Sequence, residues 1–161
     1  MQIFNIGMMR SINEPLPITG RGLNLGAGNK SLPGFTPLQL PEWDAETMPI
    51  PYPDESFEHV AAFHFLEHLK PKTVPLVMLE AQRVLVKGGV LSIVVPHRLG
   101  GMAWQDLDHK SFFTENTWRL LWENHYYSRP TDKKFKMQLH FNLIMGQDER
   151  CLALVSQFTK L

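Results

Sequence analysis

The chain of 161 residues has the size of one ordinary domain and is long enough to bury a hydrophobic core without disulfides. Hydrophobic residues make up 43% of it and charged residues 20%, which excludes intrinsic disorder, and its single cysteine excludes an internal disulfide framework and indicates a reducing, cytoplasmic location. Sixteen Lys and Arg residues balance sixteen Asp and Glu residues, so the broad positive field of a duplex-binding protein is missing and nucleic acid is not an expected partner.

The first predicted elements are short buried strands separated by a proline-rich stretch. Residues 22–26 (Gly-Leu-Asn-Leu-Gly) and residues 58–63 (Glu-His-Val-Ala-Ala-Phe) are short apolar runs, and each predicts a buried strand. Between them, six of the twelve prolines fall within residues 33–53. Because proline removes a backbone donor and breaks helices, this stretch is expected to be extended or looped.

A helix is predicted over residues 73–87 and a strand over residues 90–95. Apolar residues recur in the first segment at spacings of three and four, and Gly88 with Gly89 provides a left-handed end for the helix. The second segment, with Pro96, is the longest strongly apolar run, far short of the ~20 residues that cross a membrane, so no membrane segment is expected. Together with the preceding strand, these segments predict a right-handed βαβ unit with parallel strands.

The C-terminal third is different in kind. Residues 114–124 place Trp118 and Leu121 on one face and predict a second helix. Residues 135–145 and 151–158 then alternate apolar and polar side chains on either side of a polar turn, which predicts an antiparallel hairpin. The chain is therefore expected to be one α/β domain with parallel strands and an appended antiparallel pair.

Two glycines follow the first predicted strand, in the sequence Leu23-Asn-Leu-Gly26-Ala27-Gly28. Glycine at this place lets the chain bend sharply and lets a ligand lie against bare backbone. A dinucleotide-binding fingerprint would need a third glycine where the chain has Ser31, and no phosphate-binding loop sequence follows Gly28. Taken alone, the two glycines fit a tight turn as well as a ligand site.

Further motifs follow in order: Pro49-Ile-Pro-Tyr-Pro-Asp54, Ser56-Phe57-Glu58, His64-Phe-Leu66-Glu67-His68-Leu69 and Val94-Val-Pro96. With the glycine motif, this ordered set resembles the class I S-adenosylmethionine-dependent methyltransferases over about residues 22–121. The resemblance implies a Rossmann-like, mostly parallel sheet with helices on both faces, a C-terminal antiparallel hairpin, a shortened N-terminal region and one methyltransferase domain over residues 1–161. It also implies S-adenosylmethionine as the cofactor and S-adenosylhomocysteine as its product.

The resemblance also implies a cofactor site at the carboxyl ends of the parallel strands, where open α/β sheets bind ligands. Its residues are Gly26, Ala27, Gly28, Asn29, Lys30, Gln39, Asp44, Ala45, Phe63 and His64. In this assignment the glycine turn surrounds the methionine part of the cofactor, and Asp44 accepts a hydrogen bond from the adenine amino group, although a plain turn aspartate is the alternative. Gln39 stands where the family usually has an acidic residue, and a neutral amide should hold the ribose less strongly.

Two histidines are expected on the acceptor side, beyond the strand at residues 90–95. His97 and His109 can each remove a proton from a hydroxyl or amine as the methyl group moves, since histidine titrates near neutrality. For each, a structural loop histidine is an equal interpretation. The segment Asp108-His109 followed by Phe112-Phe113-Thr114 resembles one in relatives that methylate small molecules or sugar units, so the implied acceptor is an oxygen or nitrogen on a small-molecule or glycan-related group.

Other functions fit the sequence less well. The pattern His64-x-x-Glu67-His68 also matches an inverted zinc-peptidase motif, but His64 closes a strand and Pro71 ends the segment, so no metal site is expected. A non-catalytic module for protein binding stays open as the alternative function, because Gln39 and the short segment after the glycines weaken the cofactor site. The thin N-terminal region leaves apolar surface that a second copy can cover, so a homodimer is a further hypothesis.

Overall fold

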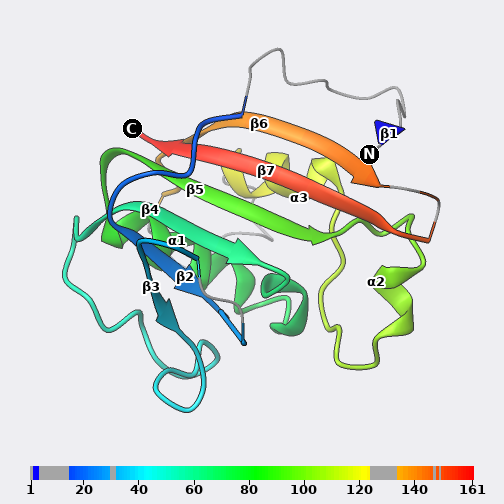
Figure 1. Cartoon of the computed structure of the whole chain (residues 1–161), viewed down its shortest axis with the longest axis horizontal. Coiled ribbons are helices and arrows are strands. Elements are labelled where there is room, and N and C mark those ends of the chain that lie inside the picture. Colours follow the sequence, from blue (N-terminus) through cyan, green and yellow to red (C-terminus); the bar gives the residue numbers. More distant parts are fainter. Residues whose placement is uncertain (1, 4–14, 30–31, 124–133, 147, 149) are drawn as a thin grey trace.

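The computed structural model describes residues 2–3, 15–29, 32–123, 134–146, 148 and 150–161, which form a seven-stranded sheet in the order β1-β6-β7-β5-β4-β2-β3 (Figure 1). The strands are β1 (Gln2–Ile3), β2 (Gly22–Leu25), β3 (Phe35–Leu38), β4 (Phe57–Phe63), β5 (Leu85–Pro96), β6 (Met137–Gly146) and β7 (Leu152–Lys160). The helices are α1 (Val74–Val84), α2 (Met102–Gln105), α3 (Glu115–Trp122) and the single 3-10 turn η1 (Leu66–His68).

The sheet has a parallel half and an antiparallel half. Strands β3, β2, β4 and β5 run parallel, with Leu23 opposite Val60 and Val60 opposite Leu91. Strand β7 pairs antiparallel with both β5 and β6, which confirms the predicted hairpin. Because the four parallel strands all end at the same edge of the sheet, the segments that follow them gather there. The predicted α/β fold is confirmed.

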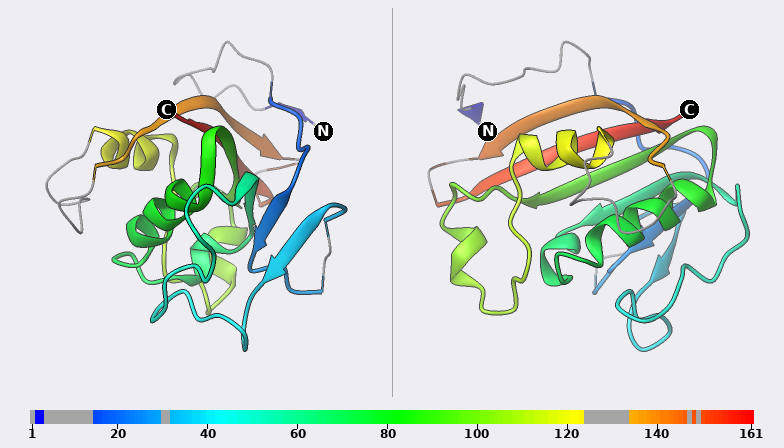
Figure 2. Two further views of the ribbon diagram at one scale, coloured as in Figure 1. Left: turned by 90° about the vertical axis from the view of Figure 1, so that its left-hand side faces the viewer. Right: turned by 180° about the vertical axis from the view of Figure 1, so that it is seen from behind.

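One face of the sheet carries the helices and the core. Figure 2 shows α1 and α3 on the same face, where the fully buried side chains of Leu91 and Ile93 belong to the main hydrophobic cluster. Trp118, from α3, is also fully buried and donates from its indole Nε1 to Ser156 Oγ on β7 at 2.7 Å. Burial of these apolar side chains, each about 1.5–3 kcal/mol, fixes both helices on the sheet.

The opposite face differs from the expectation of helices on both sides. Among the described residues it is crossed by the extended segment 15–21, not by a helix (Figure 2). Gln157 on β7 holds this segment: Leu16 N donates to its Oε1 at 2.7 Å, and its Nε2 donates to Leu16 O at 2.9 Å. The physical reason lies after β2, where the described residues form only turns and Pro33 disfavours a helix before β3 begins.

Helix α1 ends three residues earlier than predicted. It stops at Val84, and Leu85 is already extended and paired with Phe57. The carbonyl groups of the last helical turn are taken by the chain entering β4, since Ser56 N donates to Val84 O at 2.7 Å. Gly88, predicted as the end of the helix, instead adopts φ +79° inside an irregular stretch of β5.

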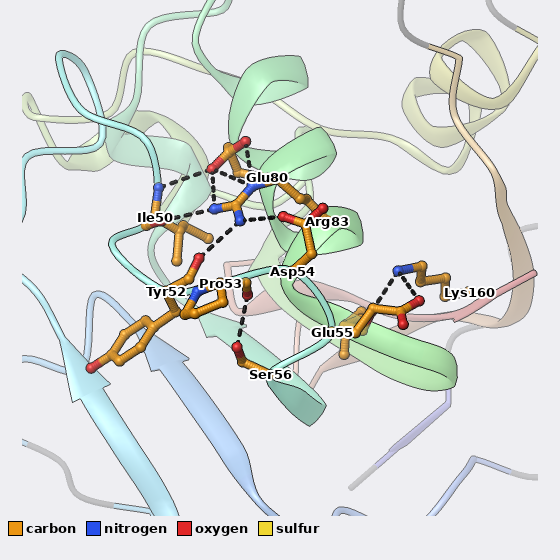
Figure 3. A network of polar contacts seen from close by, with 10 residues as sticks. Ile50, Tyr52, Pro53, Asp54, Glu55, Ser56, Glu80, Arg83 and Lys160 are labelled. Atoms are coloured by element: carbon orange, nitrogen blue, oxygen red, sulfur yellow. Dashed lines mark hydrogen bonds and ion pairs between the residues drawn. The ribbon is translucent and has the colours of Figure 1, made fainter.

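A polar network fastens the loop before β4 to α1 (Figure 3). Arg83 donates to the backbone carbonyls of Ile50 and Tyr52, each at 2.8 Å, and to Asp54 Oδ1 at 2.8 Å. Its guanidinium also pairs with Glu80 one turn earlier. These bonds, from Glu80 first and then Asp54, raise the pKa of Arg83 against the opposing effect of burial, so it stays charged. The network sets where β4 starts and therefore where its carboxyl end lies.

Candidate functional site

The glycine turn after β2 is open at one glycine and closed at the other. Gly26 and Gly28 have φ values of +64° and +55°, in the left-handed region, and Gly26 N donates to Leu38 O at 2.8 Å. A β-carbon on Gly26 would collide with the ring of Phe65, whereas one on Gly28 would meet nothing within 4 Å. The bare backbone at Gly28 therefore faces open space, which fits a bound ligand.

Phe65 links this turn to the corner formed by Trp43 and Asp44 after β3. Its ring lies 5.9 Å from that of Trp43, measured between centroids. Trp43 is buried and donates from its indole Nε1 to Met48 O and Pro49 O. Its backbone N donates to Gln39 O at 2.9 Å. Gln39, directly after β3, thus lies next to the corner that follows it in sequence. A cavity of about 290 Å³ opens beside Trp43.

Asp44 shapes a turn at this corner. Its Oδ1 accepts from Glu46 N at 2.9 Å, and its backbone carbonyl accepts from Met48 N at 2.9 Å. The corner is anchored through Glu46, which accepts from Thr73 Oγ1 at 2.6 Å. That bond and one from a backbone amide lower the pKa of Glu46 although burial opposes the change. The turn role of Asp44 is therefore present, and it leaves the side chain half-buried at the edge of the corner.

The end of β4 presents Phe63 and His64. Phe63 is half-buried, and His64 has φ +53°, with its backbone N donating to Val94 O at 2.8 Å. This left-handed backbone turns the His64 side chain outward, where 51% of it is exposed. Its Nδ1 lies 3.3 Å from Glu67 Oε1. His64 therefore lines a cleft at the carboxyl edge.

That cleft, of about 660 Å³, is where the acceptor-side residues gather. Its lining includes His64, Glu67, His68, Asp106 and His109. The backbone holds the two sides together, since the amides of residues 110 and 111 donate to Glu67 O at 2.7 and 3.0 Å. As a result the rings of His68 and His109 lie 4.9 Å apart.

The two histidines expected here have different surroundings. His97 is 2% exposed, its Nε2 lies 3.1 Å from Glu115 Oε2, and its Nδ1 accepts from Leu99 N at 3.3 Å. His109 instead lines the cleft, with Nδ1 3.1 Å from Ala103 O. Because a carbonyl only accepts, Nδ1 of His109 carries the hydrogen of this bond, and in the neutral form of the ring the lone pair is on Nε2.

The structure brings most of the predicted cofactor residues to one edge. Gly26, Ala27, Gly28 and Asn29 follow β2, Gln39 follows β3, Phe63 ends β4 and His64 follows it. Lys30 lies outside the described residues. Sequence reasoning missed Phe65 as a neighbour of the glycine turn, because nothing local distinguishes it from a core aromatic residue. It also missed the group formed by Glu67, His68 and His109, for which the sequence signal was the His64-x-x-Glu67-His68 pattern.

Comparison with known proteins adds to this geometry. Residues 24–93 match a family model described as a methyltransferase domain. This range begins at the third residue of β2, ends within β5 and includes the glycine turn, Gln39 and Asp44. No match is found among curated proteins. Within the part of the chain that the structure describes, no helix is long and apolar enough to cross a membrane.

Solved structures share the fold at low sequence identity. A possible histamine N-methyltransferase from Thermotoga maritima has a TM-score of 0.57 at 18% identity, covering 91% of this chain and 84% of that one. The N-methyltransferase NodS from Bradyrhizobium japonicum, in complex with S-adenosylhomocysteine, has a TM-score of 0.56 at 12% identity, and the match covers 86% of this chain and 76% of that one. An S-adenosylmethionine-dependent methyltransferase from Methanosarcina mazei has a TM-score of 0.55 at 16% identity, and the match covers 79% of this chain. The matched part is only 66% of the length of that protein.

Proposed function

We propose that this chain is a class I S-adenosylmethionine-dependent methyltransferase and that it methylates an oxygen or nitrogen of a small-molecule or glycan-related acceptor. The observation that carries the proposal is the pairing of two features at one sheet edge. The open backbone of Gly28 follows β2, and a cleft lined by His64 and His109 follows the neighbouring strand β4. A cofactor bound against Gly28 would therefore lie next to an acceptor bound in the cleft.

The cofactor residues fit the group that the family uses. Gly28 leaves room against its backbone that a side chain would fill, which suits the methionine part. Gln39, directly after β3, and Asp44, in the turn that follows it, are the residues that we expect to contact the ribose and the adenine. Phe65, between the glycine turn and Trp43, is the further side chain that we expect to contact the cofactor.

When bound, S-adenosylmethionine supplies an activated methyl group, which passes to the acceptor lone pair and leaves S-adenosylhomocysteine and one released proton. The protein's task is to align the acceptor and exclude water. His109 Nε2 offers a lone pair in the cleft for that proton, with its ring oriented by Ala103 O. We assign the acceptor-side role to His109 and a structural role to His97, which is buried against Glu115.

Exposed aromatic surface near the cleft supports the acceptor class. Trp104, 59% exposed, stacks on Phe112, 41% exposed, with centroids 4.1 Å apart. Trp104 is held by a bond from its Nε1 to Arg98 O at 2.7 Å. Such a patch commonly marks a binding surface, and flat rings suit the apolar face of a sugar or small ring.

The test is transfer of a labelled methyl group from S-adenosylmethionine to a panel of hydroxyl, amine and glycan acceptors. We expect wild type to label at least one oxygen or nitrogen acceptor. His109→Gln should lose at least about 100-fold in kcat while still binding S-adenosylhomocysteine. No labelling of any acceptor, with no binding of S-adenosylhomocysteine, would instead support a protein-binding module. The homodimer and the cytoplasmic location stay predictions, to be checked by light scattering and cell fractionation.

A further inference from the structure

The carboxylate of Glu67 is buried without a hydrogen bond. The residue is 1% exposed, and neither Oε1 nor Oε2 accepts a hydrogen bond from any described residue. Nδ1 of His64 lies 3.3 Å from Oε1 without a hydrogen bond, on a side chain that is 51% exposed. A buried carboxylate that accepts no hydrogen bond is strongly disfavoured, so such a group calls for a further partner of opposite charge.

Two histidines stand beside this carboxylate. His68 belongs to η1, and His109 belongs to the segment after α2, yet one ligand atom from each and one Glu67 oxygen all lie within 4.8 Å of one another. Ligands bonded to one ion at about 2.1 Å are separated by at most about 4.2 Å. His68 is half-buried, so a small rotation of its side chain can close the remaining gap, whereas the His109 side chain is only 7% exposed and is held in place.

The surroundings already orient these ligands. His109 Nδ1 donates to Ala103 O at 3.1 Å, which is the bond by which metal-binding histidines usually fix their tautomer, and Nε2 is left with its lone pair. Nε2 lies 3.7 Å from Asp106 Oδ2, a further oxygen on the cleft. The backbone bonds from residues 110 and 111 to Glu67 O keep the two segments in register.

We propose that Glu67, His68 and His109 bind one divalent transition-metal ion of the zinc class, with a coordination position open to the cleft. The set differs from the zinc-peptidase pairing that the sequence pattern suggests. That pairing needs His64 and His68 on one helical face, whereas His64 directly follows β4 with φ +53° and turns outward. The sequence predicts no metal here because His109 reaches the group only through the fold.

The site bears on the choice of acceptor, a step that rests on the proposed function. An ion in the cleft can take an acceptor oxygen as a further ligand and lower the pKa of its hydroxyl, so that water can take the proton in place of His109. A hydroxyl acceptor is then favoured over an amine. The ion itself requires only Glu67, His68 and His109.

The experiment is calorimetric titration of Zn²⁺ into chelator-stripped protein, with the visible absorption of bound Co²⁺ as an independent measurement. We expect one Zn²⁺ per chain and a tetrahedral Co²⁺ spectrum. Glu67→Gln and His109→Gln should each weaken Zn²⁺ binding by at least about 100-fold. His140→Gln is the matched control, since it removes a histidine from β6, which β7 and β5 separate from β4, and it should bind as wild type does.

Several results would overturn the proposal. They are no saturable Zn²⁺ binding at about 0.1 mM metal, a Kd unchanged in both variants, or equal weakening in His140→Gln. If Glu67→Gln fails to fold, as circular dichroism would show, the His109→Gln variant still provides the test. Titration of S-adenosylhomocysteine with chelator present separates the metal site from the proposed function. If S-adenosylhomocysteine binds but Zn²⁺ does not, only the metal site is refuted. If Zn²⁺ binds but S-adenosylhomocysteine does not, only the proposed function is refuted.

Discussion

Replacing Gly28 with alanine separates cofactor binding from folding. The backbone at Gly28 has φ +55°, so alanine carries the cost of a left-handed conformation, about 1–2 kcal/mol. No steric cost is added in the free protein, because the new β-carbon meets nothing within 4 Å. In the complex the same methyl group stands where we place the methionine part of the cofactor. We expect affinity for S-adenosylhomocysteine to fall at least about 30-fold, or about 2 kcal/mol.

Two matched glycine variants make this prediction sharp. Gly88→Ala carries the same strain, with φ +79° and nothing within 4 Å of the new β-carbon, but lies in the irregular stretch of β5. It should lose similar stability in urea and keep full affinity in calorimetry. Gly26→Ala should be the least stable of the three, since its β-carbon would lie 2.2 Å from Phe65 Cδ2. If Gly28→Ala bound S-adenosylhomocysteine as tightly as Gly88→Ala does, the placement of the cofactor would be refuted.

Three further predictions concern pH, packing and adenine. Burial lowers the pKa of His59 from 6.5 to about 4, so between these pH values the unfolded state binds more protons than the folded state. The free energy of unfolding should therefore fall by up to roughly 3 kcal/mol as the pH drops from 6.5 to 4. Urea unfolding at several pH values should show this slope, and His59→Gln should flatten it. Arg83→Lys loses the bonds to two backbone carbonyls and should cost about 2–3 kcal/mol in urea, whereas Arg119→Lys, in an exposed pair, should cost under about 0.5; equal costs would contradict the network. Asp44→Asn keeps an oxygen for the turn bond from Glu46 N but adds a donor, so S-adenosylhomocysteine should bind about tenfold more weakly in calorimetry, and unchanged affinity would place adenine elsewhere.

Much of the fold follows from local patterns. The apolar runs that predicted strands over residues 22–26 and 58–63 become β2 (Gly22–Leu25) and β4 (Phe57–Phe63). The alternating segments become β6 and β7, because the period of the side chains decides which face is buried. The predicted end of α1, at residue 87, is wrong for a reason that lies outside the local sequence. Val84 O is taken by Ser56 N, and no pattern near Gly88 reports that contact.

The site shows the same division. The glycine turn and the residues after each parallel strand could be placed from sequence, since their positions depend on strand order alone. The burial of His97 and the meeting of His68 with His109 depend on how residues 97–113 fold back across the sheet edge. Phe65 against Gly26 is likewise a contact between segments far apart in the chain. Long-range contacts of this kind have no local signature.

Titration of S-adenosylhomocysteine into the wild-type chain, followed by calorimetry, examines the glycine-turn site without reference to any acceptor. One ligand should bind per chain, with a Kd below about 0.1 mM. A flat titration up to about 1 mM ligand, in protein whose fold is verified by circular dichroism, would contradict the cofactor site and the reaction built on it.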